Sequence, residues 1–135
     1  MAIIEPSHLG DTPFQQLLGH HKDIMKTWSV LSDVLENNSA LSAELKEEIR
    51  RMLAQKNGCQ YCKAKGKPIG SITDEISAVC IGFTEVYLKL GDQIPTTYTD
   101  ILKSHLSDEE IVELITFITF TNAQQQFGAI MKLQP

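Results

Sequence analysis

Apolar residues recur every three or four positions along most of this chain, and short polar stretches separate the segments that have this spacing. The spacing matches the turn of an α-helix, which repeats about every 3.6 residues. No stretch of strictly alternating apolar and polar residues predicts a strand. We therefore expect an all-α protein.

Start and stop signals divide this pattern into helices. Thr12-Pro13-Phe14-Gln15 has the form of a capping box and predicts a short helix that ends near Gly19, whereas Ser107-Asp108-Glu109-Glu110 predicts a long one that reaches about Met131. Four other predicted helices start near residues 21, 42, 73 and 95. A further short one begins at the cysteines near residue 59, and Gly66, Pro68 and Gly70 break it.

Each longer helix has one apolar face that we expect to be buried. The faces predicted in this way comprise Ile24, Met25, Trp28, Leu31 and Leu35 in the second helix, Leu45, Ile49, Met52 and Leu53 in the third, and a stripe containing Cys80 between 73 and 90. The run 111–120 is rich in β-branched and aromatic residues, but the preceding cap favours a helix there.

Length and charge limit the possible classes of protein. A chain of 135 residues that is 42% hydrophobic is long enough for one core, so residues 1–135 are expected to form a single domain. A net charge of −5 without a basic stripe argues against a nucleic-acid partner. The first residues have neither a basic start nor a long apolar run, so we expect no membrane segment and a cytoplasmic location.

The segment Asn57-Gly58-Cys59-Gln60-Tyr61-Cys62 carries the candidate chemistry. Two cysteines separated by two residues can form a disulfide, and in a reducing compartment such a pair is expected to cycle. The Asn57-Gly58 turn predicts that Cys59 lies near the start of a short helix, where backbone N–H groups favour a thiolate. The nearby positive charges are Lys56, Lys63, Lys65 and Lys67.

Two other interpretations of the cysteine pair remain open. A zinc site normally needs a second cysteine pair or two histidines at ligand spacing, and neither follows Cys62. Cys59 and Cys62 can also be small core residues, which is the interpretation that we favour for Cys80. We expect no metal and no cofactor.

The segment from Leu45 to Cys62 closely resembles the carboxymuconolactone decarboxylase superfamily, and more narrowly its AhpD-like alkylhydroperoxidase branch. That branch has a glutamate on a helix and Asn-Gly-Cys-x-Tyr-Cys further on, and Glu47 precedes Cys59 here by the same twelve residues. The resemblance extends over 14–133, since 106–114 is also similar to the start of the family's last helix.

The resemblance implies an AhpD-like helical bundle that assembles into trimers or hexamers and reduces hydroperoxides in antioxidant defence. It implies that Cys62 is the peroxidatic thiol, Cys59 the resolving thiol, and Glu47 the distal end of a proton relay, with Tyr61 between the two cysteines. The expected partners are a peroxide substrate and an external dithiol or disulfide reductant.

This chain departs from the family pattern at Gly66, where the branch usually has a histidine. If the chain folds back near Gly58, about 10 Å along the helix axis separates Glu47 from Cys62, too far for a direct hydrogen bond. We expect water, Tyr61 or a histidine to bridge them; the candidates are His8, His20, His21 and His105. Helical spacing alone instead favours a surface ion pair between Glu47 and Arg51, and Glu48 fits the family spacing less well.

Three other functions are possible for this chain, and they differ in whether they need the two cysteines. A disulfide-exchange adaptor would exchange thiols with partner proteins and show little peroxidase turnover. A lactone decarboxylase of the wider superfamily would not need the cysteines, and a purely structural oligomer would be unaffected by oxidation except at the two thiols.

Overall fold

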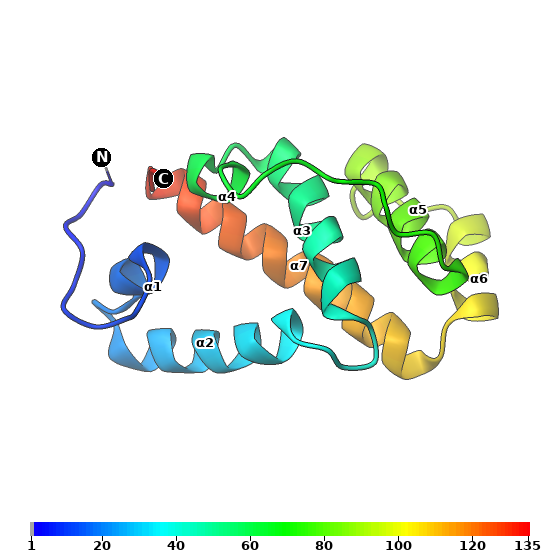
Figure 1. The fold of residues 1–135 in the computed structure, drawn as a ribbon, viewed down its shortest axis with the longest axis horizontal. Helices are drawn as coiled ribbons and strands as arrows, with labels where there is room; N and C mark the ends of the chain where they lie inside the picture. The colour runs from blue at the N-terminus through cyan, green and yellow to red at the C-terminus, as the bar shows by residue number, and fades with distance from the viewer. Residues whose placement is uncertain (1) are drawn as a thin grey trace.

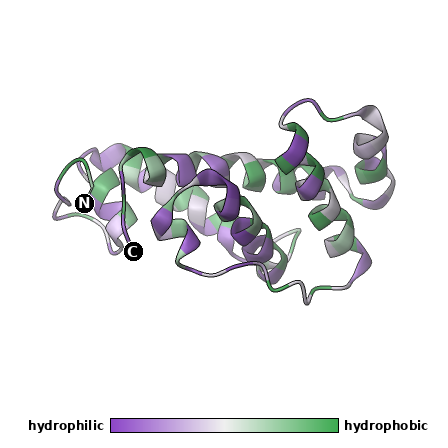
Figure 2. Cartoon of the chain, turned by 90° about the horizontal axis from the view of Figure 1, so that it is seen from above, coloured by the Kyte–Doolittle hydropathy of each residue, from purple (hydrophilic) through white to green (hydrophobic). Residues whose placement is uncertain are grey.

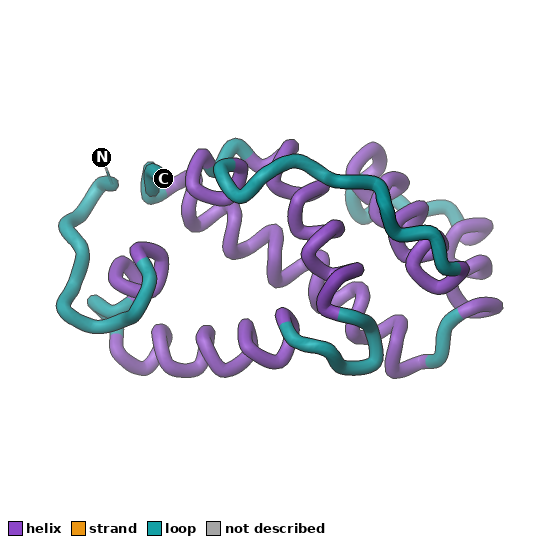
Figure 3. Tube along the Cα trace, viewed as in Figure 1, coloured by secondary structure: helices purple, strands orange, loops and turns teal. Residues whose placement is uncertain are grey.

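The computed structural model describes residues 2–135, and all regular secondary structure among them is helical (Figure 1, Figure 3). The seven helices are α1 (Pro13–Leu18), α2 (Lys22–Glu36), α3 (Ala43–Asn57), α4 (Gln60–Lys63), α5 (Glu75–Leu90), α6 (Thr96–His105) and α7 (Asp108–Ile130). The all-α prediction is confirmed, including the helix over 111–120. None of these helices is both long enough and apolar enough to cross a bilayer.

Side-chain caps start six of the seven helices of the described chain, close to the predicted starts; α6 begins after Pro95 without one. The Ser107 hydroxyl accepts the Glu110 N–H, and the Glu110 carboxylate accepts the Ser107 N–H, so the second predicted capping box is complete. The first box is only half formed. The Thr12 hydroxyl accepts the Gln15 N–H, but the Gln15 side chain accepts the N–H of Asp11 instead of that of Thr12.

The long helix α7 runs through the middle of the molecule, with α3 lying against it (Figure 1). Helices α5 and α6 cover one end of this pair, and α1 and α2 lie at the other. The main core consists of apolar side chains from α3, α5, α6 and α7, with Leu35 of α2 and Leu41 and Leu106 of the loops; among the helical ones are Ile49, Leu53, Cys80, Phe83, Leu114 and Ile118. Hydropathy colouring shows apolar and polar residues mixed along the helices (Figure 2).

The predicted apolar face of α2 is only partly buried. Leu35 lies in the core, whereas Ile24 and Leu31 are exposed. What holds α2 to the rest of the molecule is an aromatic cluster: the ring of Trp28 lies 5.0 Å from that of Phe120, and Phe14 of α1 lies 5.2 Å from Phe127. Since large rings bridge the gap, α1 and α2 stand off from α3 and α7 and leave room for a cavity.

Helix α3 also buries polar side chains that its apolar spacing does not predict. Glu48 is buried and accepts the backbone N–H groups of Ile69 and Gly70 at 2.8 and 2.7 Å. These two hydrogen bonds hold the irregular segment that follows α4 back along α3 (Figure 1). Glu48, the weaker candidate for the family glutamate, therefore holds this segment in place.

A buried ion pair joins the start of α3 to α7. Lys46 is 1% exposed, and its ammonium lies 3.3 Å from the carboxylate of Glu113. The same carboxylate accepts the N–H groups of Ala40 and Leu41 in the preceding loop. Partial burial raises the pKa of Glu113, but the hydrogen bonds from Leu41 and Ser39 and the charge of Lys46 outweigh it, so the pKa lies below its ordinary value of 4.5.

Replacing Glu113 by glutamine should destabilise the fold, because the charge of Lys46 would remain buried without its partner. We expect the free energy of unfolding at neutral pH, measured with urea, to fall by about 3 kcal/mol. Glu109→Gln in the exposed first turn of the same helix is the matched control, with an expected loss of about 0.5 kcal/mol.

The difference between wild type and Glu113→Gln should also depend on pH. A lowered pKa in the folded state means that ionised Glu113 stabilises the fold fully above its ordinary value of 4.5 and loses this effect as the pH falls through the folded pKa. The difference should therefore shrink below that pH. A difference that stays constant down to acid unfolding would show that the ion pair does not stabilise the fold.

Candidate redox site

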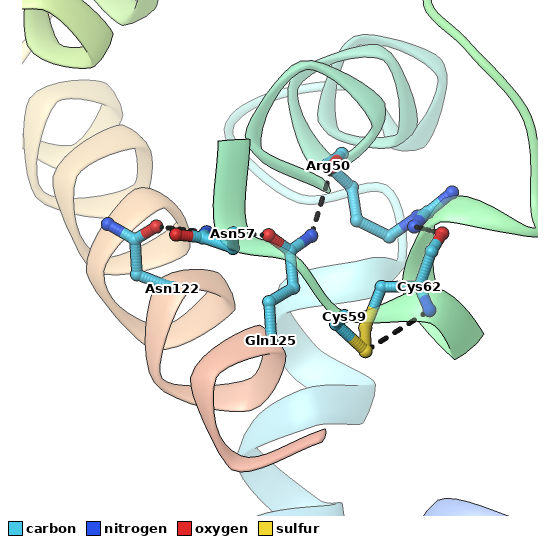
Figure 4. The surroundings of a disulfide bond; sticks show 6 residues. All are labelled: Arg50, Asn57, Cys59, Cys62, Asn122 and Gln125. Carbon is cyan, nitrogen blue, oxygen red and sulfur yellow. Dashed lines mark hydrogen bonds between the residues drawn. A yellow bond between two sulfur atoms is a disulfide. The ribbon is translucent and has the colours of Figure 1, made fainter. Parts of the chain in front are cut away.

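A disulfide joins Cys59 and Cys62 at the turn between α3 and α4 (Figure 4). Gly58 makes this turn with a φ of 69°, a left-handed conformation that suits glycine. Cys59 is the N-cap of α4, as the sequence predicts, and its sulfur accepts the backbone N–H of Cys62 at 3.2 Å. The two Cα atoms lie 5.2 Å apart, a separation common in disulfides.

The two sulfurs differ in their access to solvent. Cys59 is 0% exposed, because the backbone of α7 at Gly128 covers it, whereas Cys62 is 8% exposed and lines a cavity. A Cβ atom at position 128 would lie 2.6 Å from the Cys59 sulfur. Only glycine therefore lets α7 approach the disulfide this closely, and Cys62 is the cysteine of the pair that lines the cavity.

The cavity beside Cys62 has a volume of about 190 Å³. It lies between α1 and α2 on one side and α3, α4 and α7 on the other. Phe14 and Trp28 supply aromatic walls, and the Trp28 indole donates a hydrogen bond to the Gln124 side chain at 3.1 Å. The charged residues that line it are Asp33, Glu36, Arg50 and Lys65.

Arg50 connects the predicted glutamate with the disulfide. Its guanidinium donates to both Glu47 carboxylate oxygens at 2.6 and 3.0 Å and, through Nη1, to the backbone carbonyl of Cys62 at 3.2 Å (Figure 4). The bridge between Glu47 and the Cys62 region is thus an arginine one turn along α3. The sequence reasoning missed it, because a charged residue beside an apolar stripe is ordinarily solvated.

Glu47 lies in an ion pair with two arginines. Besides Arg50, it accepts a hydrogen bond from Arg51 Nε at 2.9 Å, and its side chain is 44% exposed. Partial burial raises the pKa of Glu47, but hydrogen bonds from Arg50 and Arg51 and their charges outweigh this and hold it below its ordinary value. The carboxylate stays ionised at neutral pH, which suits orienting Arg50 better than accepting a proton. The pairing with Arg51 that helical spacing favours is present.

Tyr61 lines the cavity beside Cys62, with the Lys65 ammonium 5.5 Å from its ring centre. Among residues 2–135, none of the hydrogen bonds links its hydroxyl to Glu47. The four histidines do not line this cavity. His20 lies 2.6 Å from the Glu5 carbonyl, His21 caps α2, and His105 lies 3.5 Å from Glu75, so none of these bridges Glu47 and Cys62 within the described chain.

Gly66 lies where the family has its histidine, and the backbone there does not suit a side chain. Its φ is 114°, a value that L residues rarely adopt, and an added Cβ would lie 3.1 Å from Nη1 of Arg51. That same guanidinium donates to the carbonyl of Lys67 at 3.2 Å. Arg51 thus occupies the space next to Gly66.

A network of side-chain amides is hydrogen-bonded to the backbone of Arg50 (Figure 4). The Gln125 amide of α7 donates to the Arg50 carbonyl at 3.1 Å, and its oxygen accepts from Asn57 at 2.8 Å. Asn57 also donates to Asn122, which is hydrogen-bonded to the Tyr87 hydroxyl. These contacts fix the part of α3 between Arg50 and Asn57, which leads into the cysteines.

The third cysteine is separate from this site. Cys80 lies in the main core, as predicted, and burial first, then the charges of Glu110 and Asp74, raise its pKa to about 12. It remains a thiol at physiological pH and acts as a packing residue. Among residues 2–135, no group of three or more His, Cys, Asp or Glu side chains lies close enough together to hold a metal ion.

Comparison with models of known protein families and with curated proteins finds no match for this chain.

Gly128→Ala should disturb the disulfide, because the new methyl group and the Cys59 sulfur cannot both keep their positions. We expect the oxidised protein to lose about 1–3 kcal/mol of unfolding free energy in urea, the usual cost of overpacking. Gly82→Ala in α5 is the matched control. A Cβ there meets no atom within 4 Å, so this change should stabilise the helix by about 0.5–1 kcal/mol. Equal effects at both positions would contradict a tight contact at Gly128.

Proposed function

We propose that this protein is a thiol-dependent peroxidase that reduces organic hydroperoxides through the Cys59–Cys62 pair, and that it belongs to the AhpD-like branch of the carboxymuconolactone decarboxylase superfamily. The observation that carries the proposal is that the two cysteines occupy different environments. Cys62 faces a cavity with aromatic walls, while Cys59 is buried behind it, within bonding distance. A substrate-facing thiol with a protected resolving thiol is what peroxide reduction requires.

The proposed cycle starts from the reduced protein. The Cys62 thiolate attacks the terminal oxygen of the hydroperoxide, the O–O bond breaks, and the alkoxide takes up a proton and leaves as an alcohol. Cys62 is now a sulfenic acid. The Cys59 thiol attacks its sulfur, water is lost, and the Cys59–Cys62 disulfide forms. An external thiol reductant then returns both cysteines to thiols by two exchange steps.

Arg50 supplies positive charge where this cycle needs it. Its guanidinium lines the cavity and contacts the carbonyl of Cys62, so its charge favours the Cys62 thiolate and the developing alkoxide. Glu47 acts through Arg50, because two hydrogen bonds fix the direction of the guanidinium. Tyr61 places a phenol in the same cavity wall, and water in the cavity supplies the proton for the alkoxide.

A protein disulfide-exchange adaptor is the alternative function. It would need a partner protein to bring its own sulfur against Cys59 or Cys62, but α7 covers Cys59, and Cys62 is reached through the cavity. The restricted access favours a small substrate. A lactone decarboxylase would leave the disulfide without a role.

The proposal includes assembly into trimers or hexamers in the cytoplasm. Helix α2 offers four exposed apolar side chains to such an interface, namely Ile24, Val30, Leu31 and Val34. Their burial between subunits would cover the outer face of the helix that forms one cavity wall.

The peroxidase function is tested by steady-state reduction of cumene hydroperoxide with dithiothreitol, measured on wild type, Cys62→Ser and Cys59→Ser. Wild type should turn over, and Cys62→Ser should lose at least about 10³-fold in kcat/KM, because the attacking thiol is gone. Cys59→Ser should consume a single equivalent of peroxide rapidly and then slow, since its sulfenic acid has no internal partner. Turnover that survives in Cys62→Ser would refute the function. A wild type that forms the disulfide without consuming peroxide would favour the exchange adaptor.

The role of Arg50 is tested by Arg50→Gln against Arg51→Gln. Both arginines pair with Glu47, but only Arg50 contacts Cys62. We expect Arg50→Gln to lower kcat/KM about 10-fold to 100-fold and to move the pH profile of kcat/KM to higher pH, because a charge beside Cys62 is lost. Arg51→Gln should stay within about threefold of wild type. Arg50→Lys keeps the charge and should retain the wild-type pH profile; equal profiles for Arg50→Gln and wild type would refute the role.

A further inference from the structure

The arrangement of the disulfide fixes which sulfur a reductant can attack. In thiol–disulfide exchange, the incoming thiolate bonds to one sulfur and the other sulfur leaves. The backbone at Gly128 blocks approach to Cys59, whereas Cys62 faces the cavity. The leaving Cys59 sulfur already accepts the N–H of Cys62 at 3.2 Å, a hydrogen bond that stabilises it as a thiolate. Attack therefore occurs at Cys62, from inside the cavity.

The size of the cavity limits the attacking molecule. Its volume of about 190 Å³ is below the roughly 300–1,000 Å³ of pockets that take drug-sized ligands. A molecule of amino-acid size fits, whereas a loop of a reductase protein would have to displace α1 and α2. The aromatic contacts of Phe14 and Trp28 with α7 oppose that displacement.

The cavity also presents charged side chains of both signs to a ligand, although the Glu36 carboxylate accepts a hydrogen bond from Ser32 and the Lys65 ammonium lies over the Tyr61 ring. Asp33 and Glu36 line it from α2, and Lys65 lines it from the segment after α4. In the described part of the chain, the ion pairs do not involve these three residues, whereas Arg50 is already paired with Glu47. A carboxylate can pair with Lys65, and an ammonium with Asp33 or Glu36.

From these observations we infer that the reductant of the Cys59–Cys62 disulfide is a small zwitterionic thiol that binds in the cavity and forms a mixed disulfide with Cys62. This inference rests on the proposed function and names its electron donor. In the first step, the thiolate of the donor bonds to Cys62 and Cys59 leaves as a thiolate. A second donor molecule attacks the donor sulfur of the mixed disulfide and releases Cys62. The two donor thiols are oxidised to one disulfide, and both protein cysteines are reduced.

The test measures reduction of the oxidised full-length protein, without peroxide, by four thiols that differ in charge. They are cysteine, cysteamine, mercaptopropionate and mercaptoethanol, compared at equal thiolate concentration by acid quenching, alkylation and mass spectrometry. Cysteine should be about tenfold faster than mercaptoethanol, since two weak ion pairs together supply about that factor. Its rate should also saturate with concentration, because it binds before it reacts.

Three variants test which charged residues of the cavity cause the preference for charged thiols. With one ion pair each, mercaptopropionate and cysteamine should react about threefold faster than mercaptoethanol. Lys65→Gln should remove this advantage for mercaptopropionate, and Glu36→Gln combined with Asp33→Asn should remove it for cysteamine. Lys67→Gln is the matched control, because Lys67 belongs to the same basic segment but does not line the cavity. It should keep the wild-type order of rates.

Two results would overturn the inference. One is a set of rates that follows thiolate concentration alone, with no effect of charge or saturation. The other is faster reduction by a reduced thioredoxin than by cysteine at equal thiolate concentration. Either result leaves peroxide turnover with dithiothreitol unaffected, whereas turnover that persists in Cys62→Ser refutes the peroxidase function without touching these exchange rates.

Discussion

The contact between α3 and α7 is the constraint on which the candidate site depends. At one end of the crossing, Lys46 pairs with Glu113; in the middle, Gln125 holds the carbonyl of Arg50; at the other end, Gly128 lies against Cys59. The apolar core supplies most of the driving force between the two helices, but these polar and close contacts fix their register. A shift of α7 by one residue would replace the glycine beneath the disulfide with a larger side chain.

Local signals explain how far the sequence alone could predict this fold. Caps such as Ser107 with Glu110 are short-range interactions, so they can be read from neighbouring residues. The cysteine spacing predicted the disulfide-forming pair for the same reason. Contacts between residues far apart in the chain were harder to predict from the sequence. Leu31 fits a buried stripe but is exposed, because Trp28 and Phe120 hold α2 away from the core; Lys46 is polar but buried, because its partner lies far along the chain.

The candidate site shows the same division between local and long-range information. The family resemblance selected Glu47 and the cysteines, and the structure places them in one region linked by Arg50. The arginine that makes the link was not predicted, since nothing in the local pattern says that its guanidinium turns towards the Cys62 carbonyl. The cavity also depends on distant segments, because Phe14 and Trp28 belong to helices that precede the motif and meet it only in the folded chain.

The position of Trp28 has a consequence for how this protein can be observed. It is the chain's only tryptophan, its indole N–H is bonded to Gln124, and its ring forms part of the cavity wall near Cys62. Indole emission depends on polarity and on nearby quenchers, and a disulfide sulfur is one of them. With excitation that tyrosine does not absorb, the fluorescence of the unlabelled protein therefore arises from a single side chain in the wall of the cavity, so changes in the cavity and at the disulfide reach one optical signal.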